Sequence, residues 1–124
     1  MPPRRAVAPD AVRRVLAAIE SGRAPERPAL AAAVRHLLAD LAERSPGHAV
    51  EVRVPPFGAV QCVEGPRHTR GTPANVIETD PVTWVLLATG RMRFGEAVDA
   101  GRVAASGARA DLAPFLLGAA AEWA

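Results

Sequence analysis

The chain has 124 residues, which indicates a single domain with one hydrophobic core. Its 15 basic residues, all of them arginine, outnumber its 13 acidic residues by only two, so the charge does not indicate a nucleic-acid-binding protein. No segment approaches the roughly 18 consecutive apolar residues that span a membrane, and no long apolar run follows the first residues as it would in a signal peptide. We therefore expect a cytoplasmic protein.

Two helices are predicted before the first strand. Residues 1–8 have the composition of a disordered basic arm, and Asp10 is a suitable N-cap for a helix over residues 10–21. A second helix is predicted over residues 29–44, because apolar residues recur there at helical spacing. The arginines of the arm have no aromatic platform or basic recognition helix beside them, so we expect a solvated arm and no nucleic-acid partner.

The hydrophobic period then changes from 3.6 to 2 residues, which marks strands. In HAVEVRVPP, valines alternate with charged residues, and AVQCVE follows after the turn PPFG, so an antiparallel hairpin is predicted. ANVIET and RVAAS predict two further strands, and the loop over residues 65–73, GPRHTRGTP, leaves room for another. Because the strands cluster in the middle of the chain, we expect an α+β fold with a largely antiparallel sheet and helices on one face.

The stretch ETDPVTWVLLATGRMRF predicts a short helix with clear ends. Asp80 is a suitable N-cap, Pro81 fits the first helical position, and Gly90 fits the position just past the end. The apolar residues between them occupy nearly every side of the predicted helix, so we expect this helix to be buried on two sides. Trp84 or Leu87 then faces away from the sheet. This second apolar side can pack in the core, line a ligand cavity or form an oligomer contact. All three roles require the same kind of side chain, so the sequence does not distinguish between them.

Two more helices are predicted after this stretch. RMRFGEAVDAG indicates a short helix that ends at Gly101, and ARADLAPFLLGAAAEW a last one, with Asp111 as a candidate cap and Pro114 in the first turn. Both helices carry apolar residues that can meet the helix over residues 80–90 from its second side. The candidate lining of an apolar cavity is Trp84, Leu87, Phe94, Val98, Leu112, Phe115 and Leu116.

No motif for catalysis, a cofactor or a metal is present. The histidines lie on different predicted elements without carboxylates or thiols at ligand spacing, and GxSxG, P-loop and GxGxxG motifs are missing. Cys62 lies in a predicted strand, where we expect a buried, inert thiol rather than a nucleophile paired with His68. We therefore expect no enzyme activity, no cofactor and no metal site.

The loop over residues 65–73 is the most polar segment. Arg67, His68 and Arg70 can together meet an anion such as a phosphate, a carboxylate or a lipid headgroup. The alternative is a solvated loop whose arginines pair with nearby acids such as Glu64. If a cavity is present, these three residues are the candidates for its polar mouth.

The C-terminal half resembles the closing part of the sterol carrier protein two (SCP-2) family. The shared marks are the helix opened by Asp80-Pro81 and ended by Gly90, the short helix ended by Gly101, and the strand that runs from Val103 into Gly107. The upstream helix and hairpin fit the family only in outline. The resemblance is closest to short bacterial members that consist of this domain alone, here over residues 9–124 with an extra helix over residues 10–21.

This resemblance implies an α+β fold with a five-stranded sheet, and an apolar tunnel between the sheet and its helices. It also implies binding or transfer of a sterol, a fatty acid or another lipid without chemistry. One alternative is an interaction module with no open tunnel, which docks a partner enzyme or forms a homodimer. Another is an accessory domain that lends Arg67 or Arg70 to a separate isomerase chain. Fold alone does not separate these functions.

Overall fold

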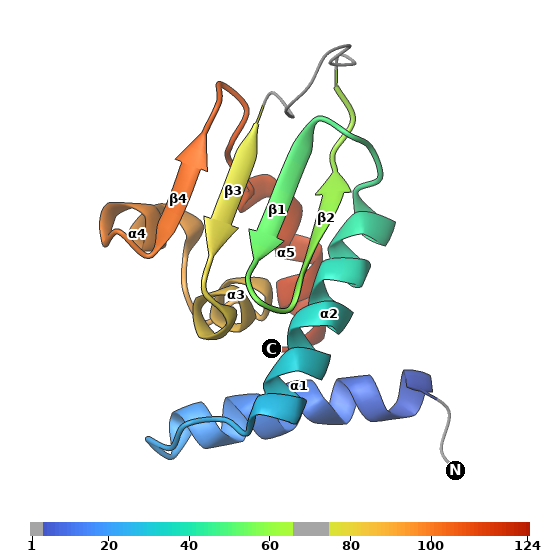
Figure 1. Cartoon of the computed structure of the whole chain (residues 1–124), viewed down its shortest axis with the longest axis vertical. Coiled ribbons are helices and arrows are strands. Elements are labelled where there is room, and N and C mark those ends of the chain that lie inside the picture. Colours follow the sequence, from blue (N-terminus) through green and yellow to red (C-terminus); the bar gives the residue numbers. More distant parts are fainter. Residues whose placement is uncertain (1–3, 66–74) are drawn as a thin grey trace.

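The computed structural model describes residues 4–65 and 75–124. Within them, helices flank and interrupt a short sheet in the order shown in Figure 1. The elements are α1 (Arg4–Glu20), α2 (Arg27–Arg44), β1 (Val50–Val54), β2 (Gly58–Cys62), β3 (Val76–Thr79), α3 (Pro81–Ala88), α4 (Phe94–Asp99), β4 (Val103–Ser106) and α5 (Ala113–Glu122). The α+β class that the sequence predicts is confirmed.

The described strands form a four-stranded mixed sheet in the order β2-β1-β3-β4. The predicted hairpin is confirmed, because β2 pairs antiparallel with β1, and β3 pairs antiparallel with β4. However, β3 lies parallel to β1, with Glu51 opposite Val76, so the sheet is not antiparallel throughout. The reason is that β2 returns the chain to the end of the sheet where β1 began. The place left for a fifth strand, residues 65–73, falls almost entirely outside the described residues.

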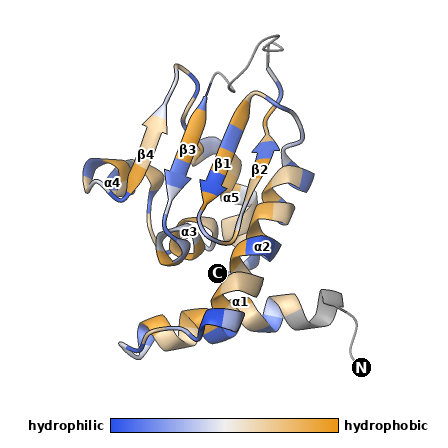
Figure 2. Ribbon diagram, viewed as in Figure 1, coloured by the Kyte–Doolittle hydropathy of each residue, from blue (hydrophilic) through white to orange (hydrophobic). Residues whose placement is uncertain are grey.

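The alternation along β1 decides which face of the sheet is buried. Val50, Val52 and Val54 are buried, whereas Glu51 and Arg53 are only half-buried on the other face, where they form an ion pair of 2.7 Å. Figure 2 shows this alternation of hydropathy along the strand. In Figure 1, α5 lies behind the sheet, α3 lies at the lower ends of β3 and β1, and α2 runs beside β2. The core therefore lies between the valine face and these helices.

Helix α1 begins at Arg4, six residues before the start that the sequence predicts. Residues 4–8 are therefore helical, where the sequence predicts part of a disordered arm, and Pro9 lies inside the helix. Proline here removes one backbone hydrogen bond near the beginning of the helix, and the arginines and alanines around it favour helix. In Figure 1, α1 crosses one end of α2, and its Val12 and Val15 are fully buried there.

The ends of α3 are those that the sequence predicts. A carboxylate oxygen of Asp80 accepts a hydrogen bond from the backbone N–H of Thr83 at 3.0 Å, and the other accepts from the Thr83 hydroxyl. Partial burial raises the pKa of Asp80, but the bonds from Thr83 and the charge of Arg102 outweigh it, so the pKa lies below its ordinary value of 3.8. Gly90 follows the helix with a φ of +79°, which favours glycine.

Candidate apolar binding site

A pocket of about 570 Å³ lies where the end of α3, the beginning of α4 and one side of α5 meet. It is lined mainly by apolar side chains and by glycines, and none of the described strand residues contributes to it. Its place therefore differs from the tunnel between sheet and helices that the resemblance implies. The lining residues are Leu87, Gly90, Met92, Arg93, Phe94, Gly95, Glu96, Ala113, Leu116, Leu117 and Ala120.

Two glycines set the shape of this pocket. A Cβ on Gly90 would lie 2.9 Å from the Cβ of Ala120, so the glycine permits the close approach of α3 and α5. At Gly95 the situation is the opposite, because no described heavy atom beyond its own helix and its chain neighbours lies within 4 Å of the position that a Cβ would take. The wall is therefore tight at Gly90 and open at Gly95.

The charges of the pocket lie at its rim. Arg93 and Glu96 pair weakly, with 3.9 Å between Nε and Oε1, and their side chains are 89% and 70% exposed. Next to them, Arg91 donates hydrogen bonds to the carbonyl oxygens of Thr89 and Trp123, and so ties the end of α5 to the end of α3. The arrangement is an apolar recess with a polar edge in water, which is the general form of a site for a small apolar ligand.

The structure separates the predicted lining residues into two groups. Leu87, Phe94 and Leu116 line the pocket. Trp84 and Leu112 are fully buried in the core, while Val98 and Phe115 are half-buried and pack against it. The side chain of Trp84 faces α2, where its Nε1 donates a hydrogen bond to the carbonyl oxygen of Val34. Of the alternatives left open for α3, core packing thus holds for Trp84, whereas Leu87 borders a cavity.

Sequence reasoning missed two large apolar lining residues, Met92 and Leu117, and two small ones, Ala113 and Ala120. A signal for Leu117 was present, because Ala113, Leu117 and Ala120 recur at spacings of four and three residues along α5 and mark one side of that helix. Met92 lies between two arginines and carries no such pattern. The predicted polar mouth, Arg67, His68 and Arg70, lies outside the described residues.

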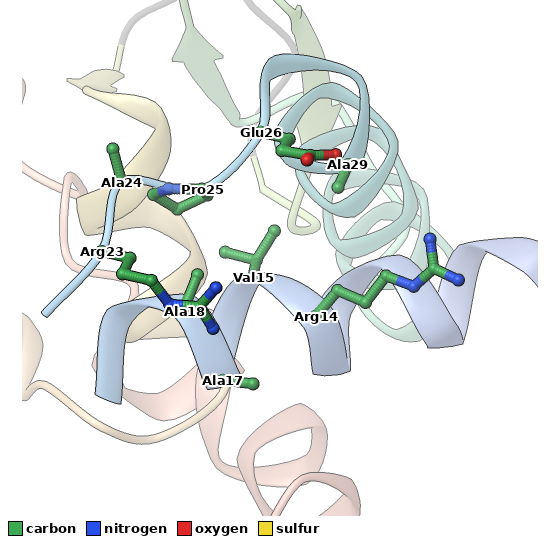
Figure 3. A pocket seen from close by; sticks show the side chains of 9 residues that line it. All are labelled: Arg14, Val15, Ala17, Ala18, Arg23, Ala24, Pro25, Glu26 and Ala29. Carbon is green, nitrogen blue, oxygen red and sulfur yellow. The ribbon is translucent and has the colours of Figure 1, made fainter. Parts of the chain in front are cut away.

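A second, smaller pocket of about 330 Å³ lies at the turn between α1 and α2. Figure 3 shows alanines, Val15 and Pro25 in its wall, with the Arg23 side chain lying along α1 towards Ala18. The guanidinium group of Arg14 points away from that of Arg23 in the same view. Because these charged groups do not converge, this pocket lacks the set of polar groups that would hold an anion.

Cys62 is fully buried, as the sequence predicts, and burial raises the pKa of its thiol to about 11. The thiol is therefore protonated at neutral pH. His68, with which a nucleophile pair was not expected, lies outside the described residues. Over residues 4–65 and 75–124, no three histidine, cysteine or acidic side chains are grouped so that they could hold a metal ion. Nor is any described helix long and apolar enough to cross a membrane.

Comparison with known protein families shows which family the chain belongs to. Residues 26–117 match the family described as bacterial SCP ortholog. The chain belongs to this SCP family. The match begins after α1 and extends into α5, so it includes every lining residue of the pocket except Ala120. A search of curated proteins finds no matching sequence. The SCP-2-like resemblance is thus confirmed, and membership of an SCP family indicates lipid binding in general terms.

Proposed function

We propose that the chain binds a lipid or another apolar small molecule, such as a sterol or a fatty acid, and performs no chemistry on it. The observation that carries this proposal is the pocket between α3, α4 and α5. Its volume of about 570 Å³ lies within the range of roughly 300–1,000 Å³ that is usual for small-molecule sites. SCP family membership supports the same class of ligand.

The driving force would be removal of apolar surface from water. An acyl chain that buried about 300 Å² against Leu87, Phe94 and Leu116 would gain about 7 kcal/mol. Part of this gain is lost to the entropy cost of association, so the buried chain by itself supports a dissociation constant weaker than about 10 μM. The exposed rim pair, Arg93 and Glu96, gives a polar headgroup a place in water beside the recess. Arg93 in particular suits the carboxylate of a fatty acid.

The first experiment is native mass spectrometry of the purified protein, followed by organic extraction of anything that travels with it. A bound lipid of defined mass supports the carrier function and gives the ligand class directly. A ligand-free mass that stays unchanged after incubation with sterols and fatty acids contradicts the proposal, and favours the interaction module instead.

A pair of variants tests whether the ligand occupies this pocket. Gly95→Leu places a large side chain where the wall is open, so the affinity for a fluorescent fatty acid should fall by about tenfold or more. Ala39→Leu is the matched control, because Ala39 is exposed in the middle of α2 and does not line the pocket. Equal affinities of the Gly95→Leu and Ala39→Leu proteins would place the ligand elsewhere.

A further inference from the structure

Three arginines from separate parts of the chain meet at the last turn of α5. The guanidinium carbon of Arg13, in α1, lies 5.5 Å from the centre of the Trp123 ring. Arg44, the last residue of α2, donates a hydrogen bond of 2.7 Å to the carboxylate of Glu122. Arg91, between α3 and α4, donates one to the carbonyl oxygen of Trp123. Because α5 has no basic residue in its last turn, the positive charge at this end of the helix comes from other elements.

Each of these contacts suits the end of a helix. The last carbonyl groups of a helix have no partner within it, and the negative end of the helix dipole attracts cations. Arg91 bonds such a carbonyl directly, whereas Arg13 lies over the ring of Trp123, whose π electrons attract a cation. In Figure 1 the C-terminal end of α5 lies near the crossing of α1 and α2. The last turn of α5 is therefore fixed against α1, α2 and the end of α3.

In the part of the chain that the structure describes, the beginning of α5 has fewer polar contacts. Leu112 is its N-cap and offers no capping side chain, and the first turn contains no acidic residue. Its backbone receives a side-chain contact from Asp111, which accepts a hydrogen bond from the N–H of Ala113. Asp111 belongs to the segment that leads into the helix and does not tie it to another element. The polar contacts that position α5 against other helices are thus concentrated at its end.

This fixed end adjoins the apolar pocket. Ala120, one turn before Trp123, lines the pocket and lies against Gly90, where an added Cβ would be 2.9 Å from the Cβ of Ala120. Since Gly90 directly precedes Arg91, the bond from Arg91 to Trp123 lies beside this contact and joins the same two helices. Here α5 is already about as close to α3 as the two backbones allow. Loosening of the last turn can therefore only move α5 away from α3, which widens the pocket.

We propose that Arg13, Arg44 and Arg91 are positioning residues for the apolar pocket. Together they hold the last turn of α5 in place, and thereby set the width of the pocket and the bulk of the ligand that it accepts. None of the three is among the described residues that line the pocket, so each acts through α5 rather than by touching the ligand. This inference rests on the proposed function, because it concerns which apolar ligands the same site selects.

Part of this arrangement lies outside the family match. The match covers residues 26–117, so it includes Arg44 and Arg91 but not Arg13, Glu122 or Trp123. The contact between Arg13 and Trp123 thus joins two segments that flank the matched region. It gives α1 a part in ligand selection, although α1 does not line this pocket.

The relative affinities for a slender and a bulky ligand test the proposal. The probes are cis-parinaric acid, a fluorescent fatty acid with one linear chain, and dehydroergosterol, a fluorescent sterol with fused rings. In Arg91→Gln, the ratio of the two affinities should shift towards the sterol by about fivefold. A protein that is merely destabilised loses affinity for both probes alike, so the ratio reports the width of the pocket.

Arg44 and Glu122 provide a second test that does not put folding at risk. Their side chains are 40% and 52% exposed, so replacing them leaves no buried void. Arg44→Gln and Glu122→Gln should each shift the ratio by about threefold, and the double variant by no more than either alone, because all remove one contact. Arg53→Gln is the matched control, since it also breaks an ion pair of 2.7 Å, on the face of the sheet opposite the core. It should leave the ratio unchanged.

Arg13→Gln isolates the contribution of α1. It removes the charge over the ring of Trp123 and should shift the ratio in the same direction by about twofold. Arg14→Gln is the control, because Arg14 is the next residue, is also exposed, and lines the second pocket instead. Equal ratios for the Arg13→Gln and Arg14→Gln proteins would remove α1 from the proposal.

The outcomes separate this inference from the proposed function. If the unmodified chain binds the fatty acid, and the ratio is the same in Arg91→Gln, Arg44→Gln and Arg53→Gln, the positioning is overturned and the proposed function stands. If neither probe binds the unmodified chain, the proposed function falls and this inference falls with it. Hydrogen exchange without ligand gives an independent check. Exchange in α5 should be faster in Arg91→Gln and Arg44→Gln than in Arg53→Gln, and equal rates would contradict the positioning.

Discussion

The Nε1 of Trp84 donates a hydrogen bond to the carbonyl oxygen of Val34 across 3.3 Å, and this bond joins α3 to α2 in the interior. Leu87, three residues later on the same helix, borders the apolar pocket instead. A helix that is apolar nearly all round thus has two buried sides with different roles. One side is core and the other is wall of a candidate binding site.

The indole of Trp84 should matter for stability and not for ligand binding. Trp84→Phe removes the bond to Val34 and leaves a small void, so the free energy of unfolding should fall by about 1–3 kcal/mol. Trp123→Phe is the control, because the buried Nε1 of Trp123 has no partner among the described residues. Denaturant unfolding should show the larger loss for Trp84→Phe, and fatty-acid affinity should be unchanged. A smaller loss than that of Trp123→Phe would mean that the bond contributes little.

Alanine substitutions at two glycines with similar φ values distinguish the energetic cost of backbone strain from the cost of a steric clash. Gly90 and Gly101 have φ values of +79° and +74°, so alanine at either position costs about 1–2 kcal/mol. At Gly90 the added Cβ would also lie 2.9 Å from the Cβ of Ala120, whereas at Gly101 no described atom outside its immediate surroundings lies within 4 Å. Thermal unfolding should therefore show a loss larger by about 1–3 kcal/mol for Gly90→Ala. Equal losses would show that α5 moves away freely.

The cap of α3 predicts a pH dependence on the acid side. The folded pKa of Asp80 is lower than its ordinary value of 3.8, so its contribution to stability is fully present above that value. The contribution is lost as the pH falls from 3.8 through the lower folded pKa. Asp80→Ala should cost about 1 kcal/mol at neutral pH and remove this part of the acid dependence. Unfolding midpoints measured at pH values on both sides of 3.8 test this, and parallel curves for the two proteins would contradict it.

The buried thiol predicts an effect of opposite sign at alkaline pH. Burial raises the pKa of Cys62 from 9.0 to about 11, so its stabilising contribution is present below 9.0 and is lost as the pH rises towards about 11. Cys62→Ala lacks this alkaline loss. At neutral pH the thiol should react with a maleimide only as fast as the protein unfolds, which mass spectrometry can follow. Rapid labelling of the native protein would show that the thiol reaches solvent.

Much of the local structure could be predicted from the sequence, because caps and turns depend on single residues. Asp80 caps α3 by accepting a hydrogen bond from the backbone N–H of Thr83 in the first turn of the helix. Gly90 and Gly101 have positive φ values, in the left-handed region that favours glycine. At the last helix the predicted cap is displaced by one residue, because Leu112 is the N-cap of α5 and has no capping side chain, while Asp111 before it accepts a hydrogen bond from the backbone N–H of Ala113. The alternating valines of β1 likewise predicted its buried face.

The candidate site could be predicted only in part. Leu87, Phe94 and Leu116 were predicted to line a cavity and do border one, but Trp84 and Leu112 share their apolar character and are core residues. Burial in a core and burial in a pocket wall require the same chemistry, so composition does not distinguish them. The difference depends on which segments meet, and α5 comes from a part of the chain distant from α3.

The sequence by itself determined the described elements, most of their ends and the α+β class, although not the beginning of α1, because these follow mainly from interactions between residues a few positions apart. Only the tertiary structure decided the parallel pairing of β1 with β3, the partner of Trp84, and the junction of α3, α4 and α5 that leaves the pocket open. It also decided that Leu117 stays exposed at the rim while its neighbour Leu116 is buried. These features depend on contacts between distant segments, whose geometry is set by the packing of the whole core rather than by any local pattern.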